Sequence, residues 1–185
     1  MKVKFMLILK YRDGRVEVVK VEKGGRPTSN TTTVWWLRIL SSILSYVSKG
    51  YPFSVSFTDT DGVARTQNFI TGTGTTYAFS SGCGDLGIGI ILGSDTTAPA
   101  DTQYKIGYFQ ASTGFYTTVD ETYYRIYSRD MIDFPVDLYV CEAALYKDVC
   151  TEAGTKVTVM LSRVTFSCKS IPADTLVTVY YTISL

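Results

Sequence analysis

The sequence contains no histidine among its 185 residues. The chain therefore lacks the side chain that most often binds metal ions and most often transfers protons near neutral pH. Its four cysteines have no C-x-x-C spacing, so neither a structural zinc site nor a redox motif is expected. These absences weigh against a metalloprotein and against a histidine-dependent enzyme, and we expect no cofactor.

The sequence also lacks a block of one charge and a long apolar run. It has 18 Lys and Arg against 17 Asp and Glu, and this balance disfavours nucleic acid as a partner, because nucleic-acid-binding surfaces are normally strongly basic. No apolar run approaches the ~20 residues that cross a bilayer, so no membrane span is expected. The apolar run at residues 5–9 is shorter than the ~7–15-residue core of a signal peptide, and we interpret it as a strand.

The four cysteines permit two disulfides. Cys141 and Cys150 are one candidate pair, which would join neighbouring strands. Four cysteines allow three pairings, and the sequence does not choose among them. The alternative is that all four are small buried apolar side chains.

The residues that are abundant favour strands. Thr, Val, Tyr and Ile suit a pleated, half-buried surface. Residues 3–22 form a predicted β-hairpin, because Asp13-Gly14 supplies the positive φ of a tight turn. This hairpin, within residues 1–24, either completes the chain's own sheet or is exchanged with a neighbouring subunit. Residues 33–185 are predicted to form a single β-domain.

One segment has the spacing of a helix. Residues 33–49 can be capped by Thr33 at the start and closed by Gly50 at the end. Apolar side chains recur there at helical intervals, namely Trp36, Ile39, Leu40, Ile43, Leu44 and Val47. An amphipathic stripe of this kind can dock on a partner or on a membrane surface, but the commoner use, which we expect here, is to cover one face of the protein's own sheet.

Residues 86–106 combine an apolar strand with a polar loop. Gly87, Gly89 and Gly93 are unfavourable inside a strand, so they predict a backbone or a large side chain passing close by. Further strands are predicted at residues 136–146, 156–168 and 176–185, with a turn at residues 172–174. The chain is therefore expected to be mostly β.

Candidate site residues are few. Tyr123, Tyr124 and Tyr127 flank Arg125, and such a pattern can stack on bases or sugars, although a cross-strand aromatic ladder is the commoner use. Trp35 and Trp36 are alternative stacking platforms. The close acidic pairs are Asp59 with Asp61 and Asp120 with Glu121. Acidic residues in turns usually form the turn, so we expect no catalytic residues and no enzyme.

Several segments, taken in order, resemble parts of tailed-phage and archaeal-virus structural proteins. The first is Gly93-Ser94-Asp95-Thr96-Thr97-Ala98-Pro99, a G-[ST]-x-T-T-x-P turn that leads into residues 101–106. The second is Glu142-Ala143-Ala144-Leu145-Tyr146, with Ala144 where that group usually has glycine. The last two are Leu161-Ser162-Arg163-Val164 and residues 171–179.

The resemblance covers residues 33–185 and implies a virion component, such as a tail, fibre or capsid-associated β-domain without catalytic residues. The expected fold is an antiparallel β-sandwich, jelly-roll-like. The expected function is that of a structural protein, located in the virion, that forms a symmetric oligomer in a capsid or tail with itself and other virion proteins. The alternative is a carbohydrate- or receptor-binding β-module that recognises a glycan or receptor on the host surface.

Overall fold

The computed structural model describes residues 2–23, 30–32, 54–68, 88–100, 102–112, 117–120, 125–150 and 155–184. Its regular structure is entirely β in these ranges, and every strand pair is antiparallel. The prediction of a mostly β chain with antiparallel sheets is confirmed. The helix predicted over residues 33–49 lies outside the described residues.

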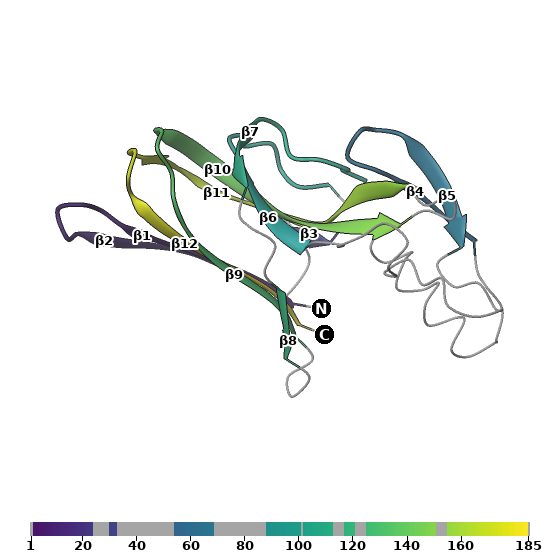
Figure 1. The fold of residues 1–185 in the computed structure, drawn as a ribbon, viewed down its shortest axis with the longest axis horizontal. Coiled ribbons are helices and arrows are strands. Elements are labelled where there is room, and N and C mark those ends of the chain that lie inside the picture. Colours follow the sequence, from purple (N-terminus) through teal and green to yellow (C-terminus); the bar gives the residue numbers. More distant parts are fainter. Residues whose placement is uncertain are drawn as a thin grey trace.

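Sheet A has five strands in the order β2-β1-β12-β9-β8. Their bounds are Val16–Lys23, Lys2–Lys10, Leu176–Ser184, Arg125–Asp133 and Thr117–Asp120. The predicted hairpin at residues 3–22 is confirmed, and its turn contains Gly14 at a φ of 85°. Strand β1 pairs with β12 of the same chain along its whole length, so in this structure the hairpin completes the chain's own sheet (Figure 1).

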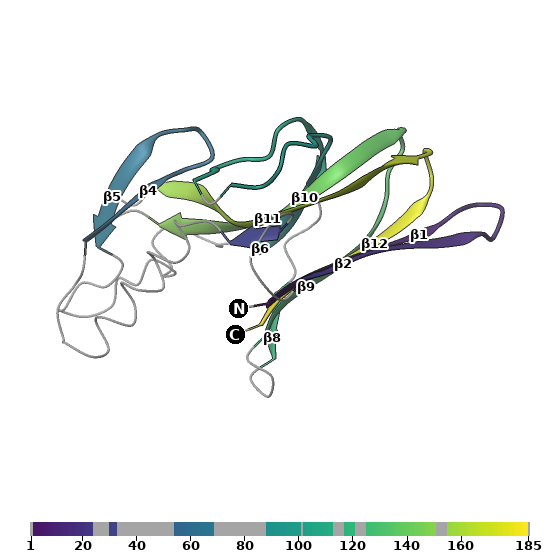
Figure 2. The ribbon, with the colours of Figure 1, turned by 180° about the vertical axis from the view of Figure 1, so that it is seen from behind.

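Sheet B also has five strands, in the order β3-β11-β10-β6-β7. Their bounds are Asn30–Thr32, Lys156–Ile171, Leu138–Cys150, Ile88–Gly93 and Phe109–Ser112. The long strands β10 and β11 pair with two register shifts, and these change which side chains face each side of the sheet. A separate hairpin of β4 (Ser54–Thr58) and β5 (Ala64–Asn68) lies beyond sheet B in both views (Figure 2).

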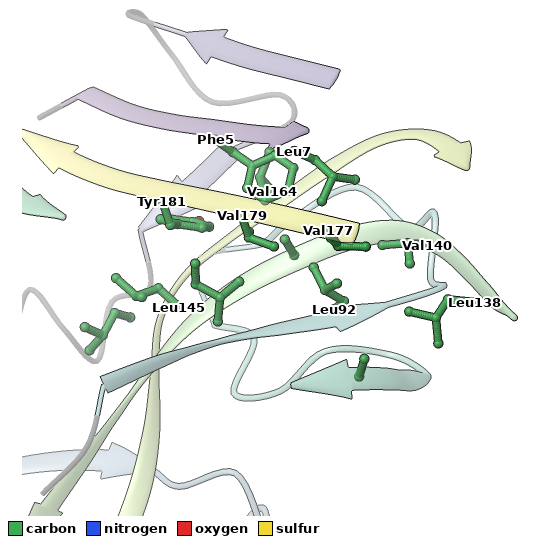
Figure 3. Close-up of a cluster of buried hydrophobic side chains, with 14 of the residues drawn as sticks. Phe5, Leu7, Leu92, Leu138, Val140, Leu145, Val164, Val177, Val179 and Tyr181 are labelled. Atoms are coloured by element: carbon green, nitrogen blue, oxygen red, sulfur yellow. The ribbon is translucent and has the colours of Figure 1, made fainter. Parts of the chain in front are cut away.

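The main hydrophobic core is shared by sheets A and B (Figure 3). Sheet A contributes Phe5, Leu7 and Leu9 from β1 and Val177, Val179 and Tyr181 from β12. Sheet B contributes side chains from β6, β10 and β11, among them Leu92, Val140, Leu145 and Val164. Because β1 supplies three fully buried side chains, and Val19 and Val21 of β2 pack against them, the β1–β2 hairpin is part of this core.

The opposite face of sheet B is also buried at its centre. A smaller cluster there consists of Ala144 and Tyr146 from β10, Met160 from β11 and Ile106 from the segment between β6 and β7. Residues 94–100 and 102–107 thus lie over the outer face of sheet B, and we refer to them as the covering loop. No helix among the described residues is long and apolar enough to cross a membrane.

Candidate functional site

Two fully buried charges lie under the covering loop. Glu142 of β10 and Arg163 of β11 form an ion pair with 2.6 Å between Oε2 and Nε. Both side chains are almost completely excluded from solvent. A buried charge without a partner would strongly destabilise the fold. The other hydrogen-bonding groups of Arg163 and Glu142 must therefore also find partners inside the protein.

The guanidinium of Arg163 also binds the covering loop at three points. Its Nη1 donates to the carbonyl oxygen of Thr97 at 2.9 Å and to Oε1 of Gln103 at 3.0 Å. Its Nη2 donates to Oδ2 of Asp95 at 3.1 Å. The planar fork of an arginine suits such a set of acceptors, which a lysine could not match. We refer to Asp95, Gln103, Glu142 and Arg163 as the ionic cluster.

The carboxylate of Glu142 anchors both ends of the covering loop. Its Oε1 accepts a hydrogen bond from the backbone N–H of Asp95 at 3.0 Å and another from that of Gly107 at 3.0 Å. Beside it, the phenol oxygen of Tyr146 accepts the N–H of Ile106 at 2.7 Å. Side chains of the sheet therefore satisfy backbone groups that a loop lying on a sheet would otherwise leave unpaired.

The local electrostatics favour the charged form of Asp95. The backbone N–H and the hydroxyl of Thr97 lower the pKa of Asp95 below its usual range, and Arg163 adds to this effect. Burial raises the pKa of Tyr146, so this residue remains a neutral phenol. All four side chains of the ionic cluster form hydrogen bonds within the protein, which is typical of a cluster that holds a loop in place.

Two glycines make the close approach possible. A Cβ on Gly93 would lie 2.9 Å from both Cγ and Cδ of Glu142, and a Cβ on Gly107 would lie 2.7 Å from Cγ of Asp95. The prediction that a large side chain passes close to Gly93 is confirmed, and that side chain is Glu142. Gly87 lies outside the described residues.

The candidate disulfide between Cys141 and Cys150 is wrong. Cys141 is bonded to Cys168, with 4.1 Å between their Cα atoms. Cys141 and Cys150 lie nine positions apart on the same strand, β10, which separates them by about 30 Å. The pairing of Val140 with Lys169 instead brings Cys141 opposite Cys168 on β11.

The tyrosines named from the sequence are not brought into a described site. Tyr123 and Tyr124 lie outside the described residues, as do Trp35 and Trp36. Tyr127 is in β9, where its backbone pairs with Thr182 and Thr118. The stacking role of these residues stays a prediction.

The acidic pair of Asp59 and Asp61 forms a turn, as expected. Oδ1 of Asp59 accepts the N–H groups of Asp61 at 3.1 Å and Val63 at 2.9 Å, and its Oδ2 binds Nε of Arg65 at 2.8 Å. This carboxylate therefore shapes the connection between β4 and β5. Glu121 lies outside the described residues, so the second acidic pair is not described.

The structure instead exposes three aromatic side chains that the sequence did not single out. Tyr108, Phe109 and Tyr139 are 73%, 62% and 53% exposed. Phe109 pairs with Gly93, and Tyr139 alternates with the core residues Leu138 and Val140, so Phe109 and Tyr139 belong to the outer face of sheet B. Oε1 of Gln110 accepts the N–H of Tyr139 at 3.3 Å and so links β7 to β10.

Comparisons of the chain with protein-family models, with curated proteins and with solved structures find no match. Within the ranges that the structure describes, no group of three or more Cys, Asp or Glu side chains is placed to hold a metal ion. The clearest geometric result concerns three segments singled out from the sequence, residues 93–99, 142–146 and 161–164. They supply Asp95 and Thr97 of the covering loop, and Glu142, Tyr146 and Arg163 of the sheet, and these residues meet where the loop contacts the sheet.

Proposed function

We propose that this chain is a non-enzymatic virion structural protein that assembles into a symmetric oligomer in a viral capsid or tail. The observation that carries the proposal is the convergence of the resembling segments on one buried cluster. Arg163 and Glu142 direct their hydrogen bonds to each other and to the covering loop. Such use of charges fixes a loop on a rigid sheet and leaves none of these groups to bind a substrate.

The proposal includes the finer architecture and the partners. We propose that sheets A and B are the two layers of a jelly-roll-like β-sandwich, since side chains of both sheets share one core. Sandwiches of this kind serve as building blocks because a rigid core supports exposed loops and self-complementary faces. Other virion proteins are the expected further partners, and the virion is the expected location.

Self-assembly is the part of the proposal that can be tested on the purified chain. We expect light scattering after size-exclusion chromatography to give a single mass that is a whole multiple of the 20.5 kDa chain. Negative-stain electron microscopy should then show closed particles of one symmetry. A mass of one chain at every concentration up to the millimolar range would contradict self-assembly.

The exposed aromatic residues favour a second candidate, a carbohydrate- or receptor-binding module on a virion or cell surface. Aromatic rings exposed on the outer face of sheet B are suited to stacking on sugar rings. We expect that glycan binding on an array would be lost in Tyr108→Ala, Phe109→Ala and Tyr139→Ala. The matched control is Val136→Ala, which removes an exposed apolar side chain that is not aromatic. Absence of glycan binding by the unaltered chain would remove this candidate.

A further inference from the structure

We propose that the free edge of strand β2 is a self-association site, at which β2 pairs with β2 of a second copy around a two-fold axis at Val18. The proposal rests on the proposed self-assembly and identifies the surface that carries it. Strand β2 is the end strand of sheet A, and no described strand pairs with its outer side.

The hairpin turn determines which backbone groups point outward. The N–H of Tyr11 donates to the carbonyl oxygen of Arg15 at 2.9 Å, so these two residues form a bonded pair. Bonded and non-bonded pairs alternate along an antiparallel ladder, which directs the N–H and C=O groups of residues 17, 19 and 21 toward β1. The same groups of Val16, Val18, Lys20 and Glu22 therefore point away from the sheet.

This edge lacks two of the usual protections against pairing, a β-bulge and a proline. The ladder between β1 and β2 has no register shift, in contrast to the ladders of β10 with β11 and β6 with β7. No proline interrupts β2, and Val16 and Val18 are 55% and 46% exposed. A regular edge with exposed β-branched side chains readily accepts another strand.

The charges along β2 favour a second copy as the occupant. A two-fold axis perpendicular to the sheet makes the strands antiparallel and keeps equivalent faces together. If the axis passes through Lys20 or Glu17, that residue lies opposite the same residue of the second copy, so two like charges face each other. If the axis passes through Val19, Arg15 lies opposite Lys23, which again sets like charges together. Only the register centred on Val18, among residues 17–20, avoids like charges, since it pairs Val18 with itself and Val16 with Lys20.

The first test uses Val18→Pro, which removes one outward N–H at the proposed axis. Because that N–H does not bond to β1, the fold of the chain should survive, as edge strands tolerate proline at such positions. We expect the mass from light scattering to fall at least twofold relative to the unaltered chain, with an unchanged circular dichroism spectrum. Val18→Thr retains both the N–H and the side-chain shape and is expected to keep the oligomer.

Two substitutions at one position test the register. Val16→Glu would lie opposite Lys20 of the second copy, whereas Val16→Lys would set two positive charges against each other. Each contact occurs twice by symmetry, so we expect dissociation constants that differ about tenfold, with Val16→Glu the tighter. Equal constants would overturn the register. Within the chain Val16 pairs with Lys10, so a charge at position 16 also changes the stability of the single chain. Thermal unfolding of both variants measures this separate effect.

A cross-link gives a test that does not depend on proline. The pairing places Val18 directly opposite its copy at a Cα separation of about 5.5 Å, which suits a disulfide. Val18→Cys should therefore give a covalent dimer under mild oxidation. Val63→Cys, at an exposed valine in the β4–β5 connection, should not.

The outcomes separate this inference from the proposed function. An oligomer that keeps its mass in Val18→Pro and gives no Val18→Cys dimer would overturn the edge proposal while leaving self-assembly intact. Another surface, such as the exposed aromatic residues, would then carry the association. An unaltered chain that stays monomeric at every concentration would overturn both.

Discussion

At the scale of single residues, the most informative side chain is Arg163. A buried ion pair contributes little net stability, because removing two charges from water offsets most of their attraction. What the Arg163 guanidinium adds is specificity, since it fits only an arrangement in which Glu142, Asp95 and the carbonyl of Thr97 converge. The cluster therefore selects one position for the covering loop.

Replacing Arg163 should be far more harmful than replacing an exposed arginine. Arg163→Met leaves the fully buried carboxylate of Glu142 without its counter-charge, and we expect a loss of about 3–5 kcal/mol in the free energy of unfolding in urea. The matched control is Arg12→Met, because Arg12 and its partner Asp174 are 75% and 40% exposed. Its expected loss is about 1 kcal/mol or less. Similar losses in the two variants would contradict the role assigned to the cluster.

Asp95 should make stability depend on acid pH. Its pKa is lower in the folded chain than in the unfolded chain, where it is about 3.9. Its contribution is therefore fully present above pH ~4–5 and is lost as the pH falls through the folded pKa. We expect Asp95→Asn to be less stable than the unaltered chain at pH 7, with the difference shrinking as the pH falls below the unfolded pKa of about 3.9.

Urea unfolding at several pH values measures this dependence. Thr97→Val, which removes the hydroxyl donor to Asp95, should reduce the acid sensitivity in part. A difference between Asp95→Asn and the unaltered chain that stays constant with pH would show that Asp95 acts through its shape and not through its charge.

At the scale of elements, the covering loop depends on the sheet below it. Its two ends are held by one carboxylate, and Ile106 packs on Tyr146 and Met160. The β1–β2 hairpin is tied in differently, through Phe5, Leu7 and Leu9 in the main core. Deleting residues 1–24 would therefore remove core side chains, and substitutions along the outer edge of β2 are the cleaner probe of assembly.

A substitution in β6, outside the covering loop, should loosen the contact of the covering loop with the sheet. Gly93→Ala forces the Glu142 side chain to move, because the new Cβ would lie within 2.9 Å of its Cγ and Cδ. We expect a loss of about 1–3 kcal/mol together with faster hydrogen exchange of the N–H groups of Asp95 and Gly107. Gly14→Ala is the control, since it strains a positive φ but meets no atom within 4 Å. It should lower stability without changing exchange in the loop.

At the scale of the whole molecule, the disulfide between Cys141 and Cys168 joins the two longest strands of sheet B. It closes a segment with a sequence separation of 27 residues, which corresponds to about 3.5 kcal/mol of stabilisation through the unfolded state. We expect a reducing agent to lower the melting temperature by roughly 7–14 °C. The double variant Cys141→Ala/Cys168→Ala should have this lower melting temperature even without a reducing agent. An unaltered chain insensitive to reduction would contradict this expectation.

The sequence determined most of the local structure. Alternating apolar residues predicted strands near β10, β11 and β12, because side chains alternate between the faces of a strand. Asp13-Gly14 predicted the β1–β2 hairpin, because few residues adopt a positive φ. Gly93 predicted a close neighbour, because a glycine within a strand normally has a packing reason.

Only the tertiary structure decided which residues meet. Arg163 lies 21 residues from Glu142 and 68 from Asp95, and their contact depends on the register of β10 with β11 and its two shifts. The same register sets Cys141 opposite Cys168 and carries Cys150 to the far end of the strand. An alternating sequence pattern shows which side chains of a strand share a face. It does not show the register of one strand against the next, or which segment packs on each face. For that physical reason the ionic cluster and the exposed aromatic residues emerge only from the folded chain.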